Sequence, residues 1–386
     1  MDLNYSPEES AFRDEVRAWI RANLADELRD KVLNYRELSK DDLLGWHRTL
    51  ATQGWVAPHW PVEWGGTDWT VVQRYIFEEE CGAAGAPPIV PFGVRMCAPV
   101  LLRFGTPEQK QRFLPRMYRG DDFWCQGYSE PGAGSDLASL KTRALRQGDH
   151  FVVTGQKTWT TLGHYADWIF CLVRSDPGRE KRQEGISFLL IDMRSPGITV
   201  RPIALMDGGH EVNEVFFDDV QVPLENLVHE EHKGWTVAKF LLGYERMGTG
   251  NIAVCKRELA RVQALAGPLL DDPRFRDRLT RVEVELMALE ITNLRFLDQL
   301  RGGRPPGAEV SLLKIKGTEI QQALTELMMQ AAGPRALAFR PVDATAAFDR
   351  FTASLAPRYC NVRKATIYAG SNEIQRNIIA KATLGL

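Results

Sequence analysis

Cysteine is scarce and scattered in this sequence. The chain has 6 cysteines in 386 residues, and no two of them form a Cys-x-x-Cys pair. This spacing argues against a disulfide framework and against a zinc site. We therefore expect free interior thiols and no bound metal.

Strong net charge and long apolar runs are also missing. The 48 basic and 50 acidic residues leave a formal net charge of -2, which gives no general attraction to nucleic acid. No run of about 20 apolar residues occurs, so membrane insertion is not expected. Met1 to Glu9 lack the basic and apolar regions of a secretory signal. The prediction is a cytoplasmic protein without a nucleic-acid partner.

A third absence concerns dinucleotide binding. Gly132-Ala133-Gly134 continues with Ser135-Asp136, so no Gly-x-Gly-x-x-Gly motif follows a strand and a Rossmann site is not predicted. These glycines belong to a stretch of small residues, 128–136. Its backbone N–H groups can approach a planar, polar cofactor without side-chain obstruction.

The apolar spacing divides the chain into three parts. Residues 1–123 have helical spacing, residues 124–231 contain short β-branched and aromatic runs, and residues 232–386 return to helical spacing. The predicted fold is α+β, with an N-terminal helical domain, a middle β domain and a C-terminal antiparallel helical bundle.

Individual elements follow from local signals. Ser6 with Glu9 predicts a capping box, and Pro7 fits the first helical position; Ser39 with Asp42 predicts a second helix start. Strands are expected at 151–154, 168–173, 186–191, 198–200 and 215–217, and long C-terminal helices at 235–265, 278–300, 308–331 and 357–383.

Three segments, 128–136, 156–161 and 367–376, resemble in order the motifs of the acyl-CoA dehydrogenase family of flavoproteins. Within that family the chain is most similar to the large subunit of pimeloyl-CoA dehydrogenase, through 57–66, 208–218 and 368–373. The resemblance implies the family fold, bound FAD and oxidation of an acyl-CoA to the trans-2-enoyl-CoA in fatty acid β-oxidation. It also implies an electron-transfer flavoprotein as electron acceptor.

The resemblance also assigns roles to residues. Those expected to contact the cofactor are Gln126, Tyr128, Ser129, Gly134, Ser135, Trp159, Thr160, Thr161, Gln330, Ser371 and Asn372. Independently, Trp159 could give a flavin ring a flat wall, and the hydroxyls of Ser129, Thr160 and Thr161 could supply hydrogen bonds. Those expected to contact the acyl-CoA are Ser135, Tyr244, Arg246, Tyr368 and Gly370, with Arg95 as a weaker candidate for a distal substrate carboxylate.

The catalytic base must be a carboxylate facing the α carbon of the thioester. Many family members place a Glu where this chain has Ala369, so Glu245, which resembles the base position of isovaleryl-type enzymes, is predicted instead. At helical spacing its face carries apolar and small residues, and neither Lys nor Arg stands three or four positions away. Burial without a cation would raise the pKa of this carboxyl. The backbone N–H of Ala369 keeps the expected oxyanion role.

The chain departs from the family motifs for the ADP half of FAD. The Arg-x-x-Phe-Gly pattern is absent from 266–276, and 330–334 match the Gln-x-x-Gly-Gly pattern only in part. We therefore hypothesise that a paralogous small subunit supplies a cation to the pyrophosphate in a heterotetramer; a homo-oligomer remains the alternative. An acyl-CoA oxidase and a non-catalytic acyl-CoA-binding subunit are the other functions left open.

Overall fold

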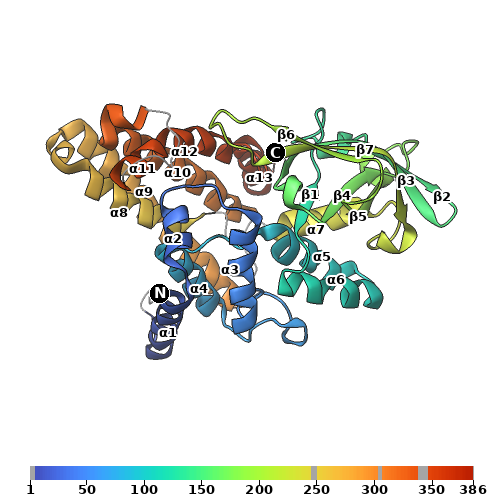
Figure 1. The fold of residues 1–386 in the computed structure, drawn as a ribbon, viewed down its shortest axis with the longest axis horizontal. Helices are drawn as coiled ribbons and strands as arrows, with labels where there is room; N and C mark the ends of the chain where they lie inside the picture. The colour runs from blue at the N-terminus through green and yellow to red at the C-terminus, as the bar shows by residue number, and fades with distance from the viewer. Residues whose placement is uncertain (1–4, 245–249, 303–306, 338–346, 386) are drawn as a thin grey trace.

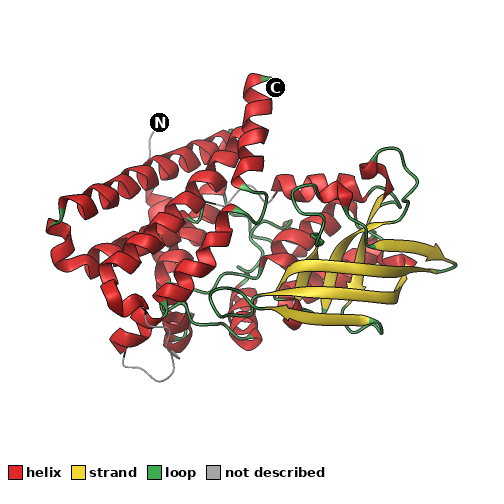
Figure 2. Cartoon of the chain, turned by 90° about the horizontal axis from the view of Figure 1, so that it is seen from above, coloured by secondary structure: helices red, strands yellow, loops and turns green. Residues whose placement is uncertain are grey.

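The computed structural model describes residues 5–244, 250–302, 307–337 and 347–385. Figure 1 shows the order predicted from the sequence, with helices at the N-terminus, a twisted sheet in the middle and a helical bundle at the C-terminus. The predicted fold class is confirmed. Seen from above in Figure 2, the sheet forms one end of the molecule and the bundle the other.

The N-terminal helices begin at the predicted caps. The Ser6 hydroxyl accepts a hydrogen bond from the Glu9 N–H (3.2 Å), and the Glu9 carboxylate accepts one from the Ser6 N–H (2.9 Å). Ser39 and Asp42 form the same reciprocal pair. The helices of this part are α1 (Pro7–Asn23), α2 (Asp26–Leu33), α3 (Lys40–Gln53), α4 (Val71–Ala84), α5 (Ala98–Phe104) and α6 (Pro107–Arg119), with a π-helix at Phe92–Cys97 before α5.

The sheet has seven strands: β1 (Trp124–Gly127), β2 (Arg143–Gln147), β3 (His150–Thr161), β4 (Trp168–Arg174), β5 (Ile186–Asp192), β6 (Ile198–Ile203) and β7 (Val212–Pro223). Their order is β1-β4-β2-β3-β7-β6, with β5 paired to β4. Every predicted run is a strand, but β3, β6 and β7 are clearly longer than predicted. β1 and β2 were not predicted, because β1 is only four residues long and β2 is mostly exposed.

Both faces of β4 are buried. Phe170 and Leu172 pack with the helices beneath the sheet, whereas Ile169 and Cys171 pack inside the curled sheet. This double burial explains why the strand has no polar alternation. α7 (Gly234–Tyr244) packs on this helix-covered face of the sheet, against β4 and β5, as Figure 1 shows.

The C-terminal bundle contains α8 (Ile252–Ala266), α9 (Pro273–Arg301), α10 (Ser311–Ala332), α11 (Ala347–Ala353), α12 (Leu355–Val362) and α13 (Asn372–Leu384). Two predicted helices are wrong in length. The helix expected at 235–265 is divided into α7 and α8, and that expected at 357–383 into α12 and α13. Between α12 and α13 the backbone turns at Ala369 (φ 52°) and Gly370 (φ 77°), which lie outside the helical region.

The six cysteines are free, and four of them are buried, as the sequence predicted. Within the described ranges, no helix is both long and apolar enough to span a bilayer.

Candidate functional site

The first two predicted segments meet directly. The backbone N–H of Thr158, near the end of β3, donates to the carbonyl of Ser129 (2.9 Å). Beside this bond, the buried ammonium of Lys157 donates to the Glu130 carboxylate (2.8 Å). Gly134, further along the same loop, is exposed, and a Cβ added there would meet no atom within 4 Å. The 128–136 loop is thus anchored on one side and open on the other.

Trp159 follows Thr158 on β3 and faces solvent. Its indole is 58% exposed, although it belongs to a strand with mostly buried neighbours. Its φ of 60° and the register shift between Lys157 and Thr160 form a β-bulge, which turns the side chain out of the sheet. A large apolar ring held in solvent by a left-handed backbone position suits a planar ligand.

Thr160 and Thr161, both predicted cofactor contacts, differ in position. Thr161 is half-buried, whereas Thr160 is 1% exposed and its hydroxyl has no hydrogen-bond partner among the described residues. The carbonyl of Thr160 accepts a hydrogen bond from the buried amide of Asn213 (3.0 Å). Asn213 therefore fixes the end of β3, a role that the sequence analysis missed.

Glu211 joins the third segment to the sheet. Its backbone carbonyl accepts from the N–H of Leu162, just beyond β3. Its carboxylate pairs with Lys364 and accepts from the amide of Asn361 (3.1 Å), both near the end of α12. The 208–218 stretch had been used only as a family resemblance, so these contacts were not foreseen.

The turn that follows presents its backbone to solvent. Tyr368 is 51% exposed, and Ala369 and Gly370 are exposed as well. Among the described residues, nothing accepts a hydrogen bond from the Ala369 N–H. Ser371 caps α13 by accepting from the Ile374 N–H (3.4 Å). The turn therefore offers a backbone donor that no described residue uses, next to a half-exposed aromatic ring.

Asn372, another predicted cofactor contact, is buried beneath this turn. Its side-chain oxygen accepts from the ammonium of Lys314 (3.2 Å) on α10. Lys314 is 4% exposed, lies 5.9 Å from the ring centre of Tyr368 and forms no ion pair with a described carboxylate. Burial lowers the pKa of Lys314 to about 8.

The remaining predicted residues near the loop have these positions. Gln126 is half-buried on β1, Tyr128 is buried with its ring edge-on to Phe170 (5.9 Å), and Ser135 is exposed. Gln330 is exposed on α10 and lies 16 residues beyond Lys314 (330 − 314), about 24 Å along the helix. It therefore does not join the other residues within this chain.

Arg95 belongs to the π-helix Phe92–Cys97, and its guanidinium lies 3.0 Å from the Glu78 carboxylate. Burial raises the pKa of Glu78, but Arg95 and His59 outweigh this and bring it down to about 2. Tyr244 is the last residue of α7. Glu245 and Arg246 lie outside the described residues.

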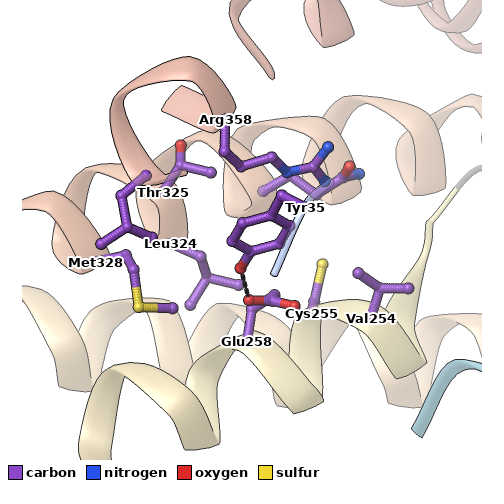
Figure 3. A pocket seen from close by; sticks show the side chains of 10 residues that line it. Tyr35, Val254, Cys255, Glu258, Leu324, Thr325, Met328 and Arg358 are labelled. Atoms are coloured by element: carbon purple, nitrogen blue, oxygen red, sulfur yellow. Dashed lines mark hydrogen bonds between the residues drawn. The ribbon is translucent and has the colours of Figure 1, made fainter. Parts of the chain in front are cut away.

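A separate small cavity lies in the bundle, between α8, α10 and α12 (Figure 3). Tyr35, Glu258 and Arg358 are among its lining residues, and its volume of about 20 Å³ would hold a single water. None of the residues predicted for the site lines it. It therefore plays no part in the candidate site.

Three family profiles match the chain: "Acyl-CoA dehydrogenase, N-terminal domain" over 6–121, "middle domain" over 125–220 and "C-terminal domain" over 232–384. The chain belongs to the acyl-CoA dehydrogenase family.

Individual relatives extend this result. The chain is 39% identical over 384 residues to acyl-CoA dehydrogenase IpdE1 of Mycobacterium tuberculosis, covering 97% of each chain. Among solved structures, the Tcur3481-Tcur3483 steroid ACAD matches with a TM-score of 0.87 and 28% identity, over 100% of this chain and 99% of that one. The ChsE4-ChsE5 complex from Mycobacterium tuberculosis gives a TM-score of 0.85 and 32% identity, with the same coverage.

The protein is therefore a flavoprotein oxidoreductase that acts on acyl-CoA with FAD as cofactor. The described residues fit such a cofactor. Gly132 and Gly134 leave the loop backbone open to a ligand that larger side chains would obstruct, and Trp159 presents an exposed flat ring. Homologues of this chain form heteromeric complexes.

Proposed function

We propose that this chain is the catalytic subunit of an acyl-CoA dehydrogenase in which Glu245 removes the α proton of the thioester. The product would be the trans-2-enoyl-CoA. FAD would supply the chemistry of accepting the β hydrogen as hydride at N5. In many family members one position supplies both the carboxylate base and the backbone N–H that binds the thioester oxygen. Here that position is Ala369, which has the N–H but no carboxylate, so the proposal assigns the base to Glu245.

The N–H of Ala369, which has no acceptor among the described residues, is the observation on which the proposal depends most. Charge develops on the thioester oxygen as the α proton leaves, so a preorganised donor there lowers the barrier. The turn holds this N–H outside both helices at φ 52° and leaves it without a described acceptor. Such a donor can bind the thioester oxygen without first breaking another hydrogen bond.

The placement of α7 supports Glu245 as the base. Val237, Ala238 and Leu241 are fully buried where α7 packs beneath the sheet, so the helix is firmly held up to its last turn. Glu245 follows Tyr244 directly in the sequence. A catalytic base needs a firm support, and the described part of α7, which precedes Glu245 in the sequence, is held in this way by packing.

The test is anaerobic bleaching of the flavin by acyl-CoA, with wild type and Glu245→Gln. We expect Glu245→Gln to keep bound FAD and lose at least about 1,000-fold in bleaching rate, since no other group would accept the α proton. Glu231→Gln, a half-buried glutamate before α7, is the matched control and should keep the wild-type rate. Substantial bleaching by Glu245→Gln would refute the assignment.

The acyl group is proposed separately. A dicarboxylyl-CoA such as pimeloyl-CoA would use Arg95, but the Glu78 carboxylate already compensates that guanidinium at 3.0 Å. The Tcur3481-Tcur3483 steroid ACAD, one of the similar solved structures, instead favours a steroid acyl group. Bleaching rates with pimeloyl-CoA, octanoyl-CoA and a steroid-side-chain CoA would rank these classes. Arg95→Ala should slow only pimeloyl-CoA if that class is correct.

A paralogous small subunit is the partner that we propose, with a homo-oligomer as the alternative. Val284, Met287 and Ile291 form an exposed apolar stripe on α9, at the helical spacing that a partner helix would cover. The names of two solved relatives describe paired subunits. Co-expression with a paralogous dehydrogenase subunit should raise the FAD content of the purified protein to a stoichiometric level. Full FAD content and activity of the chain alone would refute the heteromer.

An electron-transfer flavoprotein is proposed as the electron acceptor. An acyl-CoA oxidase differs only in letting oxygen reach the reduced flavin. Oxygen consumption during turnover therefore distinguishes the two, and the dehydrogenase should consume oxygen far more slowly than it reduces the flavoprotein.

A further inference from the structure

Lys157 is a completely buried cation next to the candidate site. Its side chain is 0% exposed, and its ammonium donates to the Glu130 carboxylate (2.8 Å) and to the carbonyl of Tyr128 (3.2 Å). Taking two charges out of water costs several kcal/mol for each ion, so a buried pair adds little net stability. Because the Lys157–Glu130 pair adds little net stability, we look for another role for it.

Glu130 uses the rest of its carboxylate to close the loop on itself. One oxygen accepts from the Lys141 N–H (2.6 Å) and the other from the Thr142 N–H (2.9 Å), where the chain enters β2. The backbone of Glu130 also exchanges two hydrogen bonds with Ala133. Burial raises the pKa of Glu130, but Lys157 and these donors outweigh it, so the pKa lies below its ordinary value. The side chain is therefore an anion that joins the start of the loop to the residues entering β2 and to β3.

The pair also fixes the distance between the loop and the end of β3. Lys157 precedes Thr158, whose N–H binds Ser129, and Trp159 follows with its exposed ring. Just beyond the loop, in the turn Leu137–Ser139, the carbonyl of Ala138 accepts a hydrogen bond from the buried Arg174 (2.6 Å). The open backbone at Gly134 and the ring of Trp159 thus stand on two segments that the Lys157–Glu130 pair connects.

We propose that Lys157 and Glu130 are positioning residues that set the separation of the 128–136 loop and Trp159, and so determine how the flavin ring is held. The proposal rests on FAD as the cofactor, and it does not depend on Glu245 or on the acyl group. Neither residue touches the reacting atoms; both act through the backbone of the loop.

The primary test is Lys157→Met, which keeps the length of the side chain and removes the charge. We expect the dissociation constant for FAD, measured by flavin fluorescence, to rise at least about tenfold. The visible spectrum of the remaining bound flavin should shift, and kcat per bound flavin should fall while KM for the acyl-CoA stays unchanged. Arg17→Met is the matched control, because it breaks a bidentate pair with Glu80 (2.8 and 2.7 Å) that joins α1 to α4 and includes no residue of the loop or of β3.

A double variant protects the test against simple misfolding. Lys157→Met combined with Glu130→Gln leaves no unpaired buried charge, so it should recover part of the thermal stability that Lys157→Met alone loses. Its FAD affinity should stay reduced, because the amide introduced by Glu130→Gln accepts through one oxygen only and cannot serve both N–H groups in the same way.

The proposal is overturned if Lys157→Met and the double variant keep wild-type FAD affinity and spectrum, or lose no more than Arg17→Met. Failure of the proposed function would look different. In that case no acyl-CoA would bleach the wild-type flavin, while the FAD affinities of the variants would still report on the loop.

Discussion

Tyr35 connects the N-terminal helices to the bundle, and Tyr35→Phe tests how much one buried hydroxyl contributes there. The residue lies between α2 and α3 at φ 52°. Figure 3 shows its ring inserted beside Arg358, with the hydroxyl donating to Glu258 on α8. The guanidinium carbons of Arg261 and Arg358 both lie 5.2 Å from the ring centre.

The expected loss of stability depends on which hydrogen bonds the Glu258 carboxylate keeps after the substitution. A hydrogen bond to a charged group contributes about 1.5–3 kcal/mol. After Tyr35→Phe the Glu258 carboxylate still accepts from Arg257 (2.9 Å) and Arg261 (3.4 Å), so it is not left unpaired. We therefore expect Tyr35→Phe to lower the free energy of unfolding by about 1–2 kcal/mol. Tyr35→Ala, which also removes the ring, should lower it by about 3–5 kcal/mol.

Urea unfolding followed by tryptophan fluorescence measures these losses, and hydrogen exchange at 30–39 reports local opening of the connection. Tyr118→Phe is the matched control, because the described residues give its hydroxyl no hydrogen-bond partner and its loss should cost under about 0.5 kcal/mol. If Tyr35→Phe costs no more than Tyr118→Phe, the hydroxyl does not secure the connection. A loss as large as that of Tyr35→Ala would equally contradict the reasoning.

Two further predictions concern the site. Because burial lowers the pKa of Lys314 to about 8 from 10.5, the unfolded chain binds more protons between these values, and stability rises with pH across that window. Between about pH 7 and about pH 9.5, the free energy of unfolding measured in urea should rise about 2 kcal/mol more for wild type than for Lys314→Met. An equal rise in both proteins would refute the lowered pKa of Lys314. Trp159→Ala removes a ring that is 58% exposed, so thermal stability should change little while the FAD dissociation constant rises about tenfold. Unchanged FAD affinity would show that the indole does not contact the cofactor.

Local signals predicted the starts of α1 and α3 and the five longest strands. The capping boxes at Ser6 and Ser39 depend only on residues three positions apart, and the run 168–173 is apolar because both faces of β4 are covered. The turn at 367–371 was missed inside a predicted helix. Its apolar spacing on both sides is helical, and a left-handed alanine at position 369 has no sequence signal.

The loop segments of the candidate site were recognisable from the sequence, but their supports were not. Glu130 and Lys157 stand 27 positions apart, and Glu211 and Lys364 stand 153 apart. No local period relates residues at such separations, so only the folded chain pairs them. The buried hydroxyl of Thr160 and the buried amide of Asn372 likewise depend on which face of the backbone is covered.

These supports explain how a site built on loops can be rigid. Lys157, Lys314 and the Glu211–Lys364 pair each join segments that are distant in sequence, and Lys157 and Lys314 are buried. The groups left open, such as the ring of Trp159 and the N–H of Ala369, stand on the segments so joined. Precise placement of ligand groups requires a supporting shell that is itself locked by packing and hydrogen bonds. Substitutions of Lys157, Lys314 or the Glu211–Lys364 pair should therefore alter how FAD is held through the segments that they join, whereas substitutions in the open set should alter binding without loss of stability.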